Sequence, residues 1–182
     1  MCKAERTQGL ERWEFLLDLK LTFDGVLLTK LERREDEIVL ETLQPHPNLK
    51  SLEISSYDGT TIFPSWMMSL TNLKRLSLDH CPSCKCLPPL GKLPSLASLH
   101  IAEMSSITQV RLEFLGIEAT ENNATDDQWS ENRLISSSFV SFPKLKELSF
   151  ASLHNWKRVG MEQRLGQIRS TILSFDINHA MA

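Results

Sequence analysis

A cluster of metal-ligating side chains stands near the middle of the sequence. Cys81, Cys84 and Cys86 follow one another closely, directly after His80. Thiolate and imidazole groups are the usual ligands of structural zinc, which needs four of them, generally as two separated pairs. The second pair is missing here, because Cys2 is remote in the sequence and His80 and Cys81 are neighbours. The cluster therefore predicts inward packing of small side chains, and no metal or other cofactor is expected.

Histidines, serines and carboxylates could also support acid–base or nucleophilic catalysis. The sequence contains 5 histidines, but none stands beside a serine or a cysteine in a recognisable nucleophile motif. No pair of carboxylates occurs in a context that separates catalysis from an ordinary solvated surface. Enzymatic activity is therefore not expected.

Composition and charge exclude several other classes of function. Hydrophobic residues make up 41% of the sequence and charged residues 24%, as in ordinary globular proteins. The formal net charge is −3 and the basic residues are scattered, so no nucleic-acid partner is expected. No apolar stretch is long enough for a membrane span, and none follows the N-terminus as a secretory signal would. With only 4 cysteines, three of them clustered, we expect a reducing, cytoplasmic location.

The elements that must position these residues are internal repeats. A block of the form leucine-x-x-leucine-x-apolar recurs along the chain. Its copies are Leu16, Leu19 and Leu21; Leu49, Leu52 and Ile54; Leu73, Leu76 and Leu78; Leu96, Leu99 and Ile101; and Leu145, Leu148 and Phe150. The blocks that begin at Leu49, Leu73 and Leu96 lie about 23 or 24 residues apart, within the spacing of leucine-rich repeats. The wider gaps before and after them leave room for inserted elements.

The repeat predicts a particular architecture. In each block the last two apolar residues alternate, as a strand with one buried face requires, and stacked units bury a continuous ribbon of leucine. We therefore predict an α/β leucine-rich-repeat solenoid with about five parallel strands on its concave face. The proline-rich returns at 63–70 and 87–94 predict a mostly irregular convex side with one or two short helices.

One such helix is predicted at residues 35–43. Ile38, Val39 and Leu43 would share one helical face there, and Pro45 and Pro47 would end the helix.

The repeats divide the chain into three regions. Residues 1–15 form an N-terminal flank, residues 16–156 the leucine-rich-repeat domain and residues 157–182 a divergent tail. Leu165, Ile168 and Ile172 in this tail have a helix-compatible spacing without a further block. A polar, acidic stretch at about 117–138 predicts an exposed loop inserted into one repeat, which is either a contact loop or a tolerated insertion.

The residues between and after the buried leucines are the candidate binding surface. They should form outward columns along the concave face when the blocks stack in register. Interface hot spots favour Trp, Tyr and Arg, so Arg75 and Tyr57 are the preferred contacts, whereas Trp66 and Trp156 are expected to pack in or beside the core. The candidate residues are Asp18, Lys20, Ser51, Glu53, Tyr57, Arg75, Ser77, Asp79, Ser98, His100, Glu147 and Ser149.

Several motifs in and around the leucine blocks carry a family resemblance. They are the stretches 43–52, 63–66, 87–96, 113–117 and 142–145. Together they resemble the repeat region of plant intracellular immune receptors, the coiled-coil-type nucleotide-binding disease-resistance proteins. The resemblance spans roughly residues 16–156. It implies recognition of a pathogen effector or a modified host protein, and restraint of a receptor's nucleotide-binding module where the chain is part of a longer one. No P-loop motif is present, so nucleotide binding is not implied.

Other protein-binding roles compete with this interpretation. A leucine-rich-repeat substrate adaptor of a ubiquitin ligase would carry an F-box-like helical segment before the repeats, and residues 1–15 are too few for one. An extracellular receptor fragment would need a signal peptide and flanking cysteine caps. We therefore predict a non-enzymatic protein-recognition scaffold in plant defence, with the ubiquitin-ligase adaptor as the alternative.

Overall fold

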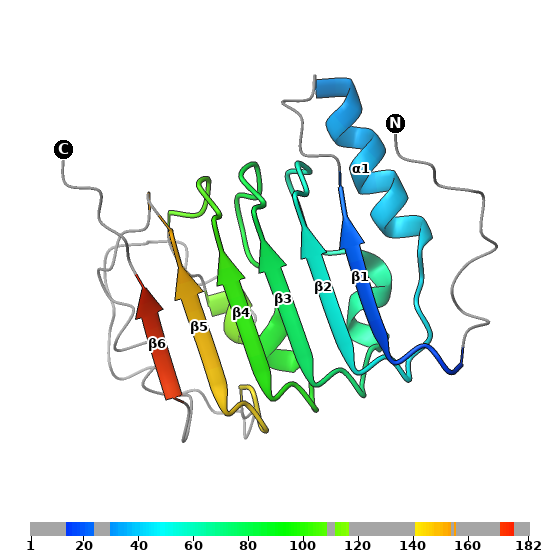
Figure 1. The fold of residues 1–182 in the computed structure, drawn as a ribbon, viewed down its shortest axis with the longest axis vertical. Helices are drawn as coiled ribbons and strands as arrows, with labels where there is room; N and C mark the ends of the chain where they lie inside the picture. The colour runs from blue at the N-terminus through cyan, green and yellow to red at the C-terminus, as the bar shows by residue number, and fades with distance from the viewer. Residues whose placement is uncertain are drawn as a thin grey trace, which may run out of the picture.

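The computed structural model describes residues 14–23, 30–108, 112–116, 141–153, 155 and 172–176, with the backbone alone for 30–34, 112 and 172–176. The strands form one six-stranded parallel sheet in chain order (Figure 1). They are β1 (Asp18–Thr22), β2 (Ser51–Ser55), β3 (Arg75–Asp79), β4 (Ser98–Ala102), β5 (Glu147–Ala151) and β6 (Ile172–Asp176). The helical segments lie together on one side of this sheet, behind it in Figure 1.

Each of the five leucine blocks forms a strand, as predicted. The pairing is in register, so Leu19 lies beside Leu52 and Leu76 beside Leu99. Leu52, Leu76 and Leu99 are at most 2% exposed. Burial of one such side chain contributes about 1.5–3 kcal/mol relative to leaving it in water, which no single repeat could obtain alone. The stack of leucines therefore holds the sheet together.

The chain enters successive strands in the same way. The carbonyl of Lys50 accepts hydrogen bonds from the backbone N–H groups of Lys74 and Arg75, at 2.8 and 3.0 Å. The carbonyls of Leu17, Lys74 and Ala97 each accept a corresponding pair of N–H groups from the next strand. These bonds fix where each strand starts against its neighbour.

The chain also leaves the strands in a repeated way. The residue after β2 is Ser56, whose φ is 57° and whose N–H donates to the carbonyl of Asp79 at 3.1 Å. A left-handed φ is uncommon for residues other than glycine, yet His80, Glu103 and Ser152 also adopt it directly after their strands. This turn directs the next side chain into the core. The residues buried in this way are Tyr57, Cys81, Met104 and Leu153.

The convex side is mostly irregular, as predicted from its prolines. Among the described residues it carries, beside the helix α1 (Lys30–Thr42), three short 3₁₀ helices: η2 (Ser65–Ser69), η3 (Leu90–Lys92) and η4 (Leu112–Leu115). Pro64 and Pro89 precede η2 and η3 with φ of −68° and −74°, values that the proline ring imposes. In the described part of the chain, no helix is long and apolar enough to cross a membrane.

The helix predicted at 35–43 is present as part of α1, but its inward face differs from the prediction. Leu40 is the buried residue, at 1% exposure, and its carbonyl accepts the indole N–H of Trp66 at 2.9 Å. Ile38 is 62% exposed, because a residue two positions from Leu40 points to the opposite side of a helix. Ile38 therefore does not share the inward face of α1, whereas Val39 and Leu43 are partly buried against the core, as the predicted helical face requires.

The sheet continues beyond the last predicted block. Ile172 has a helix-compatible spacing in the sequence, but this residue instead begins β6. This strand pairs with β5, so that Leu148 lies beside Leu173 and Phe150 beside Phe175. The sheet thus extends into the region 157–182 that the sequence indicated as a divergent tail. Leu165, Ile168, Trp156 and the polar insertion at about 117–138 lie outside the described residues.

Candidate protein-binding surface

Alternate residues of the strands build the outward face of the sheet. The pairing confirms that the candidate residues within the strands, all but Tyr57, stand in columns, since each lies beside its counterpart in the next strand. One column reads Asp18, Ser51, Arg75, Ser98 and Glu147; the next reads Lys20, Glu53, Ser77, His100 and Ser149; Asp79 belongs to a third, with Thr22, Ser55, Ala102 and Ala151. Because the intervening leucines are buried, these columns are fixed to a packed core.

Ion pairs cover the first three strands of this face. Lys20 Nζ lies 2.6 Å from Oε1 of Glu53, and Arg75 Nη2 lies 3.1 Å from Oδ1 of Asp18. The side chains of Arg75 and Asp18 are 65% and 68% exposed, so a partner can reach both. The charges of β1, β2 and β3 therefore largely neutralise one another in the free chain.

The centre of the face is formed by small polar side chains around one histidine. Ser77 and Ser149 flank His100 in the neighbouring strands, and Ser98 precedes it in β4. His100 is half-buried, and its ring forms no hydrogen bond with any residue that the structure describes. Its nitrogens are therefore available to a partner on the open side of the sheet.

Tyr57 does not belong to this face, and its prediction as a contact is wrong. Its side chain is 0% exposed, because the left-handed turn at Ser56 sends it into the core. The hydroxyl donates a hydrogen bond to the carbonyl of Thr61 at 2.7 Å, and the ring packs edge-on against Phe23 at 5.1 Å between centroids. Burial raises the pKa of the Tyr57 hydroxyl well above its usual value. Trp66 is buried as well, as predicted.

The cysteine cluster is buried rather than poised for chemistry. Cys81 turns inward, as predicted, and its thiol donates to the carbonyl of Asp79 at 3.3 Å; Cys84 is likewise buried beside the carbonyl of Gly59. Burial raises the pKa of Cys81 to about 12 and that of Cys84 well above its ordinary value. The thiolate is the form that attacks or binds metal, so burial disfavours both activities. Among the described residues, no three potential ligands gather around a metal-sized site.

The stacked strands and irregular returns match a known family of repeats. Residues 3–104 match the family model described as R13L1/DRL21 LRRs, where LRR denotes leucine-rich repeats. The chain belongs to this family. It is 31% identical over 162 residues to the disease-resistance protein RGA4 of Solanum bulbocastanum, an alignment that covers 88% of this chain. It is also 44% identical over 72 residues to RGA1 of the same species, covering 38% of this chain.

Further relatives extend the same likeness. A disease-resistance RPP13-like protein of Arabidopsis thaliana is 30% identical over 132 residues, or 71% of this chain. The matched stretches make up 15% of RGA4, 7% of RGA1 and 11% of the RPP13-like protein, so the chain spans a small part of the length of these relatives. No solved structure matches the chain. The resemblance to plant disease-resistance repeats drawn from the motifs is thus confirmed.

The R13L1/DRL21 repeats of this chain also carry an ion pair that the sequence did not indicate. Nδ1 of His80 lies 2.8 Å from Oε2 of Glu103, with both side chains about half exposed. Both residues occupy the left-handed position that follows a strand. Neighbouring repeats place equivalent positions side by side, and Leu78 pairs with Ile101. His80 follows Leu78 by the same sequence interval as Glu103 follows Ile101, so this interval could have predicted the ion pair.

Proposed function

We propose that this chain is a protein-recognition segment of a plant disease-resistance receptor, with the concave face of its sheet as the binding surface. The observation that carries the proposal is the set of outward columns, in which exposed polar side chains of successive strands stand side by side on a leucine core. Such a surface binds by complementarity of shape and charge and needs no catalytic group.

The partner that we propose is a pathogen effector or a modified host protein, met in the cytoplasm. The names of the relatives support a role in disease resistance and favour it over the ubiquitin-ligase adaptor. Because the chain spans so little of their length, we also propose that it acts within a longer receptor and helps to hold that receptor's nucleotide-binding module inactive.

Arg75 and His100 are the residues that we expect to contribute most to binding. Arginine is enriched at interface hot spots, and Arg75 is exposed beside a serine on either side of its column. A partner carboxylate could replace Asp18 on the guanidinium. His100 lies at the centre of the face, where a bound protein excludes water best.

Quantitative affinity purification tests this proposal. The tagged chain, placed in its full-length receptor, would be recovered from infected and uninfected leaves as wild type, Arg75→Glu and His100→Ala. Glu113→Lys, an exposed residue of η4 at the back of the sheet, serves as the control. We expect at least one co-purified protein to be lost from both concave variants and kept by the control. Identical partner sets for all four proteins in each kind of leaf would contradict binding at this face.

A further inference from the structure

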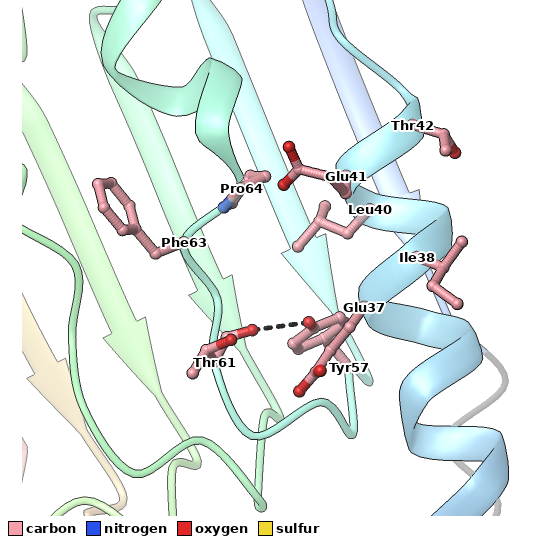
Figure 2. Close-up of a pocket in the computed structure, with 9 residues that line it drawn as sticks. All are labelled: Glu37, Ile38, Leu40, Glu41, Thr42, Tyr57, Thr61, Phe63 and Pro64. Carbon is pink, nitrogen blue, oxygen red and sulfur yellow. Dashed lines mark hydrogen bonds between the residues drawn. The ribbon is translucent and has the colours of Figure 1, made fainter.

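A second recessed surface lies on the convex side of the molecule. An open groove of about 510 Å³ separates α1 from the segment that leads into η2. Figure 2 shows Glu37, Ile38 and Glu41 on the α1 side and Thr61, Phe63 and Pro64 on the other. The buried side chains of Leu40 and Tyr57 form part of its lining.

The groove is bordered by apolar side chains that the fold leaves in water. Ile38 is 62% exposed and Phe63 is 45% exposed. Only Phe15 and Leu17 are comparably exposed large apolar residues in the part of the chain that the structure describes. A single exposed apolar side chain is ordinary, but two at the margins of one groove indicate a contact surface.

Two carboxylates lie between these apolar margins. Oε2 of Glu41 accepts the backbone N–H of Ser65 at 3.0 Å, and the Ser65 hydroxyl donates to its other oxygen. Oε1 of Glu37 accepts both the N–H and the hydroxyl of Thr60, each at 2.8 Å. The bonds from Ser65 lower the pKa of Glu41 below its ordinary value, so this carboxylate is ionised at neutral pH.

All these donors are uncharged, so the negative charge of the groove is not compensated by them. Among the residues that the structure describes, neither Glu37 nor Glu41 forms an ion pair. Figure 2 shows both carboxylates between Phe63 on one side and Ile38 on the other. The groove thus presents an apolar margin, fixed negative charge and a second apolar margin.

We propose that this groove binds a segment of a partner protein in which lysine or arginine is flanked by bulky apolar side chains. The basic group would pair with Glu41 and Glu37, which their bonds to Ser65 and Thr60 already hold in place, and the apolar groups would cover Phe63 and Ile38. The groove lies on the opposite side of the sheet from the concave columns. Both surfaces can therefore be occupied together, and this inference does not depend on the function proposed for the concave face.

Fluorescence anisotropy with defined peptides tests the inference on the full chain. The main probe is a short labelled peptide of alternating Leu-Leu and Lys-Lys pairs. In one comparison peptide glutamate replaces lysine, and in another serine replaces leucine. We expect the Leu–Lys peptide to bind about ten-fold more tightly than either comparison, which corresponds to about 1.4 kcal/mol.

Matched variants locate the binding site. Glu41→Gln retains an acceptor for Ser65 but removes the charge, and Phe63→Ser removes an apolar margin; each should weaken binding of the Leu–Lys peptide about ten-fold. Glu113→Gln and Phe15→Ser make the same changes at exposed positions outside the groove and should leave the affinity within about two-fold of wild type.

Circular dichroism and urea midpoints establish that each variant is folded. Glu37→Gln replaces Glu41→Gln, and Ile38→Ser replaces Phe63→Ser, where the first variant is not folded. Equal affinities of the wild type and the groove variants would overturn the inference. So would equal weakening by the control variants, or equally tight binding of the glutamate peptide. None of these outcomes bears on the concave face, which Arg75→Glu tests with a different partner.

Discussion

Nη2 of Arg75 lies 3.1 Å from Oδ1 of Asp18, although their strands β3 and β1 are not neighbours in the sheet. Ser51 stands between them in the column. Its small side chain leaves room for the guanidinium to cross β2. The ion pair therefore sets the shape of the concave face as well as its charge, because it lays the arginine along the sheet rather than away from it.

We expect this pair to contribute little to stability. Both side chains are more than half exposed, and exposed ion pairs are typically worth about 0.2–1 kcal/mol. A double-mutant cycle with Asp18→Asn and Arg75→Gln, measured by urea denaturation, should give a coupling free energy in this range that decreases as salt is added. A salt-independent coupling of about 2 kcal/mol or more would show that the pair is shielded from solvent.

Gly91 should tolerate no side chain. A Cβ at this position would lie 2.2 Å from the carbonyl oxygen of Leu115, which is backbone and cannot rotate away. The Gly91 carbonyl also accepts the N–H of Phe142 at 2.9 Å, so a shift of η3 would disturb the next repeat. We expect Gly91→Ala to lower the free energy of unfolding by about 1–3 kcal/mol.

Ser95→Ala, a change of similar size at a partly exposed position before β4, is the control for Gly91→Ala. Its free energy of unfolding should stay within about 0.5 kcal/mol of the wild type. Equal urea midpoints for Gly91→Ala and the wild type would mean that η3 and η4 can separate without cost.

Ser152→Gly should make the chain more stable. The φ of Ser152 is 52°, a left-handed value that costs a residue with a Cβ about 1–2 kcal/mol. Glycine removes this strain, but its greater conformational freedom in the unfolded chain offsets part of the gain in stability. We expect a gain of about 0.5 kcal/mol in the free energy of unfolding. Ser149→Gly, inside β5, should instead destabilise. A loss of stability in both variants would contradict the strain argument.

Cys81 should make the fold sensitive to alkali. Burial raises the pKa of its thiol from 9.0 to about 12, whereas the unfolded chain titrates near the ordinary value. The unfolded state therefore releases this proton first. The stabilisation from a neutral buried thiol is complete below about pH 9 and is lost progressively as the pH rises from about 9 to 12.

Urea denaturation across this pH range measures the effect. Cys81→Ala should show a shallower fall in the free energy of unfolding than the wild type does. Cys86→Ala, at an exposed position, should follow the wild-type slope. Parallel curves for Cys81→Ala and wild type would assign the alkaline loss to other groups, such as the buried hydroxyl of Tyr57.

The strands and the outward columns could be predicted from the sequence because parallel, in-register pairing follows directly from a repeat of fixed spacing. β6 was missed because Ser170 stands where the first leucine of a block would be, although Leu173 and Phe175 keep the alternation. The position of Tyr57 could have been predicted too. It follows Ile54 by the same interval as Cys81 follows Leu78, and Cys81 was correctly predicted to turn inward.

Other features depend on contacts that no periodicity encodes. The burial of Leu40 rather than Ile38 reflects how α1 lies against Trp66, whose indole bonds to the Leu40 carbonyl. The groove beside α1 arises from the same docking. The contact of Arg75 with Asp18 depends on side-chain conformations over Ser51. Such features follow from tertiary packing, which produces no periodic pattern in the amino-acid sequence.

The pairing of Ser98 with Glu147 is as regular as that of Arg75 with Ser98, although about twice as many residues separate the two strands along the chain. The length of a return segment is therefore decoupled from the geometry of the sheet. Insertions and deletions can accumulate between β4 and β5 over evolutionary time while every column of the concave face keeps its alignment. The segment between β4 and β5 can therefore change in length and sequence without altering the concave face beside it.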